Sequence, residues 1–501
     1  MNNTFKITNV CLYDGSGTPP FQADISIENG FIAEVAPAGK SAFCTEQIIN
    51  ADDMSLAPGF VDVHSHSDSS VLNIPSGDSK ISQGITTEVV GNCGFTDYLD
   101  MDEYNRLFDE ANPALNIAVL LGFNSIRYAV MGNDNRPATA EEREKMKSIL
   151  ATGLKKGAAG MSSGLWYIPG KYADTEEVCY VASALKGTGK PYATHIRNED
   201  SELLEAMEEA AVIARAGDNN LQYSHFKTCV STNWHKINDA LAMVEKYRAE
   251  GMKVTADHYP YLYTGTSLRM AVPSPFDVIA DLPQQLKNDA GLCQKLIDAF
   301  RQNGGPDVPW DKIILIHTYE PEDAGFCGKN IAEIAELMQK TPEETYVYLL
   351  SRGRPDAAYG KMCIQNLRKI LARDWVMPGS DSSVHPFVSP VCHPREFGTM
   401  SRFFRLACES ASIQEVIRRM TSLPAEKFNI AKRGRITPGY AADMVLFQPD
   451  EMNADENYSK PDTLARGIHK VFVNGVLAFD EGKCTTGKRG GQFLRIETQS
   501  C

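Results

Sequence analysis

The sequence lacks the apolar segments that direct a chain to or through a membrane. Its opening residues, MNNTFKITNV, contain no basic stretch followed by an apolar core, so we expect no secretory signal. A run of about 18 apolar residues occurs nowhere, which argues against a membrane-spanning helix and against a membrane partner. We therefore expect a cytoplasmic protein.

Positive charge is also scarce. The chain of 501 residues carries 50 Lys and Arg against 64 Asp and Glu, a formal net charge of −14. Such an acidic chain is poorly suited to the phosphate backbone of nucleic acids, so we expect no nucleic-acid partner. A local basic pocket for an acidic small molecule remains compatible with this balance.

Cysteine is present, but not in the spacing of a small disulfide-stabilised scaffold. The 12 cysteines are scattered along the chain, and without a secretory signal we expect reduced thiols. The hydrophobic content of 43% is ordinary for a globular protein. A chain of this length has room for about two or three domains.

The stretch APGFVDVHSHSDSS, residues 57–70, contains the first candidate site. The apolar run at 60–63 leads directly into His64 and His66. Residues i and i+2 of a strand point to the same face, so both imidazoles would face one way at the strand's end. An isolated pair of this kind is a weak signal, but its position after an apolar strand favours a metal site.

Seven further short apolar segments follow, and each ends in polar side chains. We expect strands within 86–94, 116–125, 157–165, 190–199, 220–228, 253–261 and 374–383. Amphipathic helices alternate with them, and one is expected over 201–217, with Ser201 as its N-cap and Gly217 at its end. Eight such units predict an α/β fold, a (β/α)₈ TIM-like barrel with its active site at the carboxyl ends of the strands.

Both ends of the chain contain short alternating strands, and the pair Asn474-Gly475 predicts a hairpin turn near the C-terminus. The gap between the seventh and eighth strands is too long for a simple crossover. We therefore expect three parts: a small β-sandwich from residues 1–57 and 433–501, a catalytic barrel at 58–432, and an inserted helical subdomain at about 270–370.

The predicted strand ends carry six side chains that suit one metal centre. They are His64, His66, Cys93, His195, His225 and Asp381. Imidazole, thiolate and carboxylate are the ligands of zinc and similar metals. Taken singly, each has an ordinary structural explanation, such as a buried thiol or a helix cap. Six of them in order at strand ends are poorly explained in that way.

Several segments together carry a family resemblance. They are PGFVDVHSHSD, ISQGITTEVVGNCG, GMSSGLWYIPG, THIRNE, SHFK, YPY, GSDSS, HPREFGT and MTSLPAEKFNIAKRGRITPGYAADMVLF. The chain resembles the amidohydrolase superfamily, and specifically the D-aminoacylases (N-acyl-D-amino-acid deacylases). The resemblance covers most of the chain and is thinnest over about 270–370. It implies a barrel of the metal-dependent hydrolase type that uses zinc to hydrolyse the linear amide of N-acyl-D-amino acids.

The resemblance also implies roles for the metal ligands. Cys93, His195 and His225 match the ligands of a tightly held zinc. The remaining three candidates match a second, weaker site: His64, His66 and Asp381.

Strand four departs from the pattern of other relatives. Hydantoinases and dihydroorotases bridge two metals through a carboxylated lysine there, whereas this chain has Ser162 and Ser163. Cys93 is the expected substitute, and this leaves open whether one metal or two is bound.

A mechanism and a substrate site follow from the same resemblance. The metal would activate a water, with Asp381 as general base and then general acid. Arg395 matches the arginine that grips the substrate carboxylate, and Tyr259 matches a tyrosine that assists it. The family's binding serine falls at Thr266 or Ser267, and we choose Ser267, although YPYLYTGTSL is one residue longer here.

Two further cations are candidates for the substrate pocket. Lys227 either contacts substrate or pairs with a carboxylate of the wall, and Arg269 is a candidate partner for an acidic side chain. The sequence is compatible with acidic substrates such as N-acyl-D-glutamate and with neutral ones. The preferred acyl group and the oligomeric state are also left open.

Two other functions compete with this one. Another amidohydrolase activity on the same scaffold, such as that of a hydantoinase, dihydroorotase or isoaspartyl dipeptidase, is the alternative enzyme. A catalytically inactive scaffold that binds partners is the non-enzymatic alternative. Inactive relatives usually lose ligands or the catalytic carboxylate, and all six candidates are present here.

Overall fold

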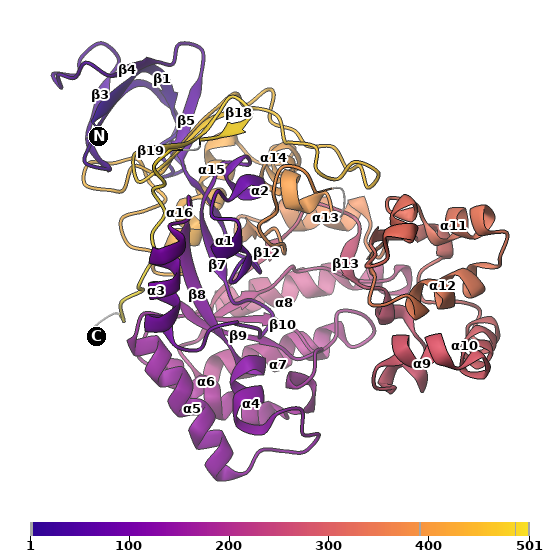
Figure 1. Ribbon diagram of the computed structural model, residues 1–501. Coiled ribbons are helices and arrows are strands. Elements are labelled where there is room, and N and C mark those ends of the chain that lie inside the picture. The colour runs from indigo at the N-terminus through magenta and orange to yellow at the C-terminus, as the bar shows by residue number, and fades with distance from the viewer. Residues whose placement is uncertain (1–3, 390–391, 486, 499–501) are drawn as a thin grey trace.

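The computed structural model describes residues 4–389, 392–485 and 487–498. An eight-stranded parallel sheet forms the centre of the molecule (Figure 1). In order its strands are β6 (Phe60–Asp62), β7 (Ile85–Val90), β8 (Asn116–Gly122), β9 (Gly160–Gly164), β10 (Tyr192–His195), β11 (Asn220–Tyr223), β12 (Lys253–His258) and β16 (Val376–Pro378). All eight strands expected from the sequence are present, and the prediction of a (β/α)₈ barrel is confirmed.

Helices connect and surround these strands. They are α1 (Ser70–Asn73), α2 (Asp78–Ile81), α3 (Met101–Ala111), α4 (Phe123–Met131), α5 (Ala140–Lys155), α6 (Thr175–Ala182), α7 (Leu203–Ala216), α8 (Ile237–Ala249), α13 (Ile364–Leu371), α14 (Arg395–Ala407), α15 (Ile413–Met420) and α16 (Ser422–Lys427). The strands between them are buried on both faces, and every residue of β8 is buried. This explains why these strands read as continuous apolar runs rather than as alternating patterns.

Helix α7 ends where the sequence predicted but begins later. It starts at Leu203, and Ser201 makes no capping hydrogen bond. The side chain of Asn198 accepts hydrogen bonds from the backbone N–H groups of Asp200 and Glu202 instead. The prediction of Ser201 as N-cap was therefore wrong: Glu202 is the N-cap residue, without a side-chain capping bond, and the Asn198 turn occupies the residues before it.

The barrel has a seam between its first and last strands. No regular hydrogen-bonded ladder joins β6 to β16 in the described chain. Beyond the strand ends, a single bridge pairs Ser65 with Ser382, and the N–H of Val63 lies 3.4 Å from the carbonyl oxygen of Pro378. The two sides of the seam carry His64 and His66 on one edge and Asp381 on the other.

A second sheet joins both ends of the chain, as expected. Its nine strands are β1 (Phe5–Leu12), β2 (Phe21–Glu28), β3 (Phe31–Pro37), β4 (Ile48–Asn50), β5 (Ser55–Pro58), β17 (Met444–Phe447), β18 (Ile468–Val473), β19 (Val476–Asp480) and β20 (Lys483–Cys484). Asn474 and Gly475 form the turn between β18 and β19, both with positive φ, as the hairpin signal predicted.

This sheet folds over onto itself. Two strands, β5 and β17, separate β1 from β18, so a flat sheet would hold β1 and β18 about 14 Å apart at the usual strand spacing. The rings of Phe5 on β1 and Phe472 on β18 are nevertheless stacked with centroids 5.1 Å apart. The two halves of the sheet therefore face each other across a shared apolar core, in the manner of a sandwich.

The third sheet lies in the insertion between β12 and β16, which forms the separate lobe of Figure 1. Its strands are β13 (Thr264–Ser267), β15 (Asp356–Tyr359) and β14 (Ile313–His317), and its helices are α9 (Leu282–Asn288), α10 (Ala290–Gln302), α11 (Ile331–Met338) and α12 (Pro342–Ser351). The helices were expected, whereas the antiparallel sheet was not. The lobe has an apolar core of its own, which includes Phe300, Leu315 and Tyr346.

No helix in the described ranges is long and apolar enough to cross a membrane. The cysteines that lie within those ranges are all free thiols, and Cys501 lies outside them.

Candidate metal centre and active site

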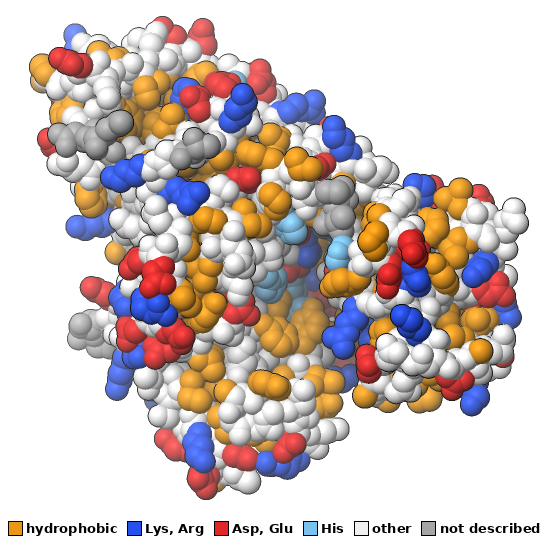
Figure 2. Space-filling view, in the orientation of Figure 1, with side chains coloured by type: hydrophobic (Ala, Val, Ile, Leu, Met, Phe, Trp, Pro, Cys, Tyr) orange, Lys and Arg blue, Asp and Glu red, His pale blue; other side chains and the backbone are white. Residues whose placement is uncertain are grey.

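The predicted site residues meet in a hollow between the barrel and the lobe. Histidine side chains are visible at the bottom of this hollow in Figure 2. The cavity is lined by strand-end residues of the barrel, including His195, His225 and Asp381. On the other side it is lined by residues of the lobe. This is the carboxyl end of the parallel strands, where barrels of this class carry their active sites.

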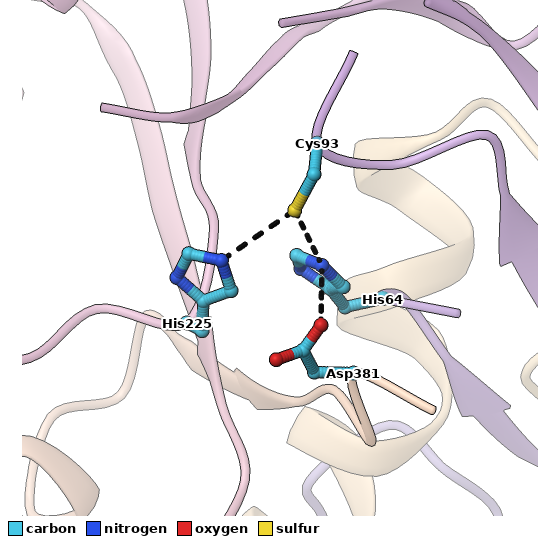
Figure 3. A group of neighbouring side chains, drawn as sticks. All are labelled: His64, Cys93, His225 and Asp381. Carbon is cyan, nitrogen blue, oxygen red and sulfur yellow. Dashed lines mark hydrogen bonds and ion pairs between the residues drawn. The ribbon is translucent and has the colours of Figure 1, made fainter. Parts of the chain in front are cut away.

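Cys93 lies at the centre of the predicted ligand set. Its Sγ is 3.3 Å from Nε2 of His64 and 3.5 Å from Nε2 of His225 (Figure 3). It is also 3.9 Å from Nδ1 of His195. The ring nitrogens of His195 and His225 are 2.9 Å apart. The three imidazoles therefore converge on the same sulfur atom.

This arrangement fits a zinc ion. Ligands held about 2.0–2.3 Å from a tetrahedral zinc lie about 3.3–3.7 Å from one another. The distances from Sγ to His64 and His225 fall in this range, and the 3.9 Å to His195 lies just outside it. Burial alone would raise the pKa of the Cys93 thiol, but His64 and His225 hold it well below its usual range. The sulfur is thus poised as a thiolate, the form that binds metal.

The other candidate ligands lie on the opposite side of Cys93. Oδ1 of Asp381 is 3.4 Å from Nε2 of His64 and 3.1 Å from Nε2 of His66. Ligand atoms of His64, Cys93, His225 and Asp381 all lie within 4.8 Å of one another. All six residues singled out in the sequence are therefore brought together around Cys93 and Asp381.

Three of these six residues have a backbone conformation that side chains rarely adopt. The φ angles are +52° at Cys93, +37° at His225 and +51° at Asp381. Positive φ costs free energy for residues other than glycine and persists only where the surroundings enforce it. Gly379 also permits a close approach, because a Cβ there would lie 2.6 Å from Cβ of His64.

Ser162 shows what replaces the strand-four lysine. Its hydroxyl accepts a hydrogen bond from the N–H of Gly94 at 3.0 Å and donates to the carbonyl oxygen of Gly91 at 2.5 Å. The loop between these glycines carries Cys93. Strand four therefore supplies no ligand here and instead holds the loop that presents the thiolate.

Asp257 at the end of β12 was missed in the sequence. Its Oδ1 lies 3.0 Å from Nδ1 of His64 and accepts the backbone N–H of His225 at 2.7 Å. Its other oxygen accepts a hydrogen bond from Gln222. A carboxylate behind a ligand histidine fixes the ring's tautomer and orientation, so Asp257 holds two ligands at once.

Glu199 was missed as well, and it decides between the two roles open for Lys227. The Lys227 ammonium lies 2.5 Å from Oε1 of Glu199, which is also 3.0 Å from Nδ1 of His225. Burial alone would raise the pKa of Glu199, but Lys227 and the histidines hold it well below its usual range. Lys227 is therefore paired with a carboxylate of the wall while also lining the cavity.

Arg395 sits at the start of α14 beside Asp381. Its guanidinium lies 2.8 Å from Oδ2 of Asp381 and 4.9 Å from the ring centroid of Tyr259. The imidazole of His393 accepts the backbone N–H of Arg395 and so positions the helix start. Nε of Arg395 is buried without a hydrogen-bond partner among the described residues, which leaves a donor for an incoming carboxylate.

The electrostatics keep Asp381 ionised. Burial alone would raise its pKa, but Arg395 together with hydrogen bonds from His64 and His66 holds it well below its usual range. His258, at the end of β12, is buried with Nδ1 unpartnered in the described chain. Burial and the nearby Lys227 lower the pKa of His258 to about 3, so its imidazole is neutral.

On the lobe side the structure corrects one assignment, that of Ser267, and leaves the candidate Arg269 outside the cavity. Thr266 lines the cavity, whereas Ser267 lies outside its wall and accepts the backbone N–H of Arg269. Arg269 donates to the carbonyl oxygens of Asp277 and Ile279 within the lobe and does not line the cavity. Alternation along β13 explains the correction at Ser267, since neighbouring residues of a strand face opposite sides.

One cation of the cavity was not foreseen. Lys361, between β15 and α13, lines the wall contributed by the lobe and forms no ion pair with a described residue. Trp166 and Tyr167 line the mouth, as the sequence suggested.

Comparison with known proteins matches nearly the whole chain. Models of the amidohydrolase family match residues 47–304 and 360–478. The chain is similar to N-acyl-D-aspartate deacylase of Alcaligenes xylosoxydans xylosoxydans, with 31% identity over 98% of this chain and 94% of that protein. It is also similar to D-aminoacylase of that organism, with 30% identity over 96% of each chain.

The fold matches a solved structure of a related enzyme. That structure is N-acyl-D-glutamate deacylase from Bordetella bronchiseptica, complexed with zinc and a phosphonate inhibitor that mimics the tetrahedral intermediate. It shares 29% identity and a TM-score of 0.82, with 98% of this chain and 99% of that chain covered.

Proposed function

The chain belongs to the amidohydrolase family, and on that premise we propose that it hydrolyses N-acyl-D-amino acids to a carboxylic acid and a free D-amino acid. The observation that carries this proposal is the ligand set centred on Cys93, with Ser162 in place of the strand-four lysine. That replacement separates the chain from enzymes that open cyclic amides.

The residues that would hold zinc fall into two groups. Cys93, His195 and His225 would bind the tighter ion, and the second group would offer a weaker site: His64, His66 and Asp381. When bound, zinc supplies Lewis-acid activation of water and of the scissile carbonyl. Asp257 and Glu199 keep the imidazoles oriented for this task.

Asp381 is the proposed proton carrier. As an ionised carboxylate at the centre of the site, it accepts a proton from the attacking water. It then delivers that proton to the amide nitrogen as the C–N bond breaks, so that the amino acid leaves as a neutral amine. One carboxylate suffices for both transfers because the water and the leaving nitrogen flank the same carbonyl carbon.

Arg395 is the proposed anchor for the substrate's α-carboxylate. Its unpartnered Nε and its contacts with Asp381 and Tyr259, which both line the cavity, suit a paired hydrogen bond to a carboxylate. Tyr259 packs against the guanidinium face, and Thr266 offers a hydroxyl from the lobe. Lys227 adds positive charge to the same wall, although Glu199 already neutralises it.

The alternative is another amide hydrolysis on the same scaffold. An isoaspartyl dipeptidase needs a free α-amino group on its substrate, so a blocked amine distinguishes the two activities. The site would then need a carboxylate free to bind an ammonium group. Of the carboxylates that line the cavity, Glu199 is paired with Lys227 and Asp381 with Arg395, whereas Asp200 forms no ion pair with a described residue.

The test is amine release from paired N-acetyl-D- and N-acetyl-L-amino acids, neutral and acidic, with zinc and then with a chelator. We expect chelator-sensitive hydrolysis of the D-substrates only. Hydrolysis of none of them by zinc-loaded protein would overturn the proposal.

We also propose that the enzyme acts in the cytoplasm. The free thiols of the described cysteines support a reducing compartment. Its partner is a small-molecule substrate.

A further inference from the structure

A buried cluster of polar side chains lies behind the metal centre, at the barrel seam. We define this seam cluster as Asp62, Lys80, Glu88, Ser380 and Ser382. All five side chains are buried, and Asp62, Lys80 and Glu88 have no solvent exposure. None of them lines the cavity, so none contacts substrate there.

Lys80, on α2, is the hub of the seam cluster. Its ammonium lies 3.1 Å from Oδ2 of Asp62 and 2.9 Å from Oε1 of Glu88. It also donates to the hydroxyls of Ser380 at 2.7 Å and Ser382 at 2.8 Å. Although burial lowers the pKa of Lys80, Glu88 and Asp62 raise it, so the ammonium stays charged.

Burying such charges is costly unless each is fully paired and hydrogen-bonded. An apolar cluster of the same volume would hold the seam at lower cost. The presence of a charged cluster is therefore explained better by a requirement to orient the backbone on both edges of the seam than by a requirement for stability.

The cluster's hydrogen bonds reach the backbone of both edges of the seam. Oδ1 of Asp62 accepts the N–H of His64 at 3.2 Å and the N–H of Ser380 at 2.9 Å. Glu88 accepts the hydroxyl of Ser65, between the two ligand histidines. Ser380 and Ser382 flank Asp381 on either side.

Main-chain contacts complete the link across the seam. The N–H of Asp381 donates to the carbonyl oxygen of His64 at 2.8 Å, and the N–H of His66 donates to that of Ser382 at 2.9 Å. Asp381 holds its positive φ within this frame. The regular strand ladder that would otherwise set the spacing of these edges is missing here in the described chain.

We propose that Lys80 and Asp62 are positioning residues that set the distance and orientation of Asp381 relative to His64 and His66 across the barrel seam. They act through the backbone and through the flanking serines, and contact neither substrate nor metal. The kinetic part of this proposal rests on the proposed function, whereas its metal-binding part does not.

The test is the double variant Lys80→Met/Asp62→Asn, which leaves no bare buried ammonium and leaves Glu88 as the one carboxylate of the seam cluster, where it still accepts the hydroxyls of Ser65 and Ser67. Ligand misplacement of about 1 Å costs about 100-fold in rate, and loss of outer-shell support costs about 10–100-fold in metal affinity. We expect kcat on N-acetyl-D-amino acids to fall about 100-fold with KM changed less than about threefold. Zinc affinity, measured by chelator competition, should fall about tenfold or more.

Lys190→Met is the matched control. Lys190 is also fully buried, and its ammonium donates to three backbone carbonyl oxygens, of Leu154, Ala158 and Ile496. It lies just before β10, at the end of the barrel opposite the site. We expect the Lys190→Met variant to lose thermal stability while its kcat and its zinc affinity stay within about threefold of the wild-type values.

Three outcomes would overturn the proposal. One is a folded double variant with wild-type kcat and zinc affinity. Another is a Lys190→Met control with the same losses. If the double variant fails to fold, Ser380→Ala/Ser382→Ala decides instead, and wild-type zinc affinity in that variant would also overturn the proposal. Should the wild type hydrolyse no N-acyl-D-amino acid, the zinc measurement still tests the positioning role, so the two failures are distinguishable.

Discussion

The two walls of the cavity differ in how firmly the protein holds them. On the barrel wall, Cys93, His195 and His225 are buried, and carboxylates behind the wall orient the imidazoles. On the lobe wall, Thr266, Met270 and Lys361 are half-exposed, and within the described chain their side chains form no hydrogen bonds. The side chains of the barrel wall are thus held by several contacts each, which suits the chemistry. Those of the lobe wall are held by few contacts, which suits the setting of substrate preference.

The largest expected effect is on the barrel wall, at Asp381. Asp381→Asn removes both the proton acceptor and the proton donor, and should lower kcat about 1,000-fold or more. Turnover of N-acetyl-D-amino acids by zinc-loaded protein measures this. Near-full turnover with zinc bound would show that the proton is carried elsewhere and that the barrel wall does not fix the chemistry.

Loss of Asp257 should have the next largest effect. Asp257→Asn weakens the support of His64 and of the His225 loop, and should lower zinc affinity about 10–100-fold. Chelator competition measures it. The control is Asp24→Asn, a buried carboxylate of β2 that accepts the backbone N–H groups of Asn9 and Gly39 far from the site. Equal zinc affinity in the Asp257→Asn and Asp24→Asn variants would show that Asp257 does not support the ligands, and would contradict the view that the barrel wall is the firmly held one.

The lobe wall should affect selection rather than turnover. Lys361→Met removes its unpaired cation, so the ratio of kcat/KM for N-acetyl-D-aspartate to that for N-acetyl-D-leucine should fall about tenfold, the size of one charged hydrogen bond. Lys340→Met, on the lobe but outside the cavity, serves as the control. An unchanged ratio would mean that the lobe wall does not read the side chain's charge.

The smallest effect is expected just outside that wall. Ser267→Ala should change kcat and KM less than about threefold and cost about 1 kcal/mol of stability, because its hydroxyl only accepts the N–H of Arg269. Thr266→Ala, one residue away on the cavity side, should raise KM more. A Ser267 variant with the stronger kinetic defect would reverse the assignment of these two hydroxyls.

Sequence patterns predicted the barrel, and pointed to the candidate ligands, for one physical reason. Barrel strands are buried on both faces and several are largely apolar, so a histidine at a strand end is conspicuous, as with His195 at the end of β10. Asp257 escaped notice because it precedes His258, which is the more conspicuous residue but has an unpartnered ring nitrogen in the described chain.

Other features depend on tertiary contacts that a linear pattern does not encode. Lys80 lies on a four-residue helix and is of a residue type usually found at the surface, yet it is fully buried among oxygens from three other segments. The short strand β14 is too brief to be told from a buried helix by periodicity. Ser201 is not the cap because the turn closed by Asn198 delays the helix start to Leu203.

The sheet built from both ends of the chain has a consequence for biosynthesis. Strand β5 ends at Pro58, and its partner β17 begins at Met444. At translation rates of about 5–20 residues per second, β5 emerges on the order of 20–80 s before the strand that pairs with it. For that interval its edge is an open template for other chains. A nascent-chain chaperone that shields β1 to β5 during synthesis would therefore raise the yield of this enzyme more than one that acts after release.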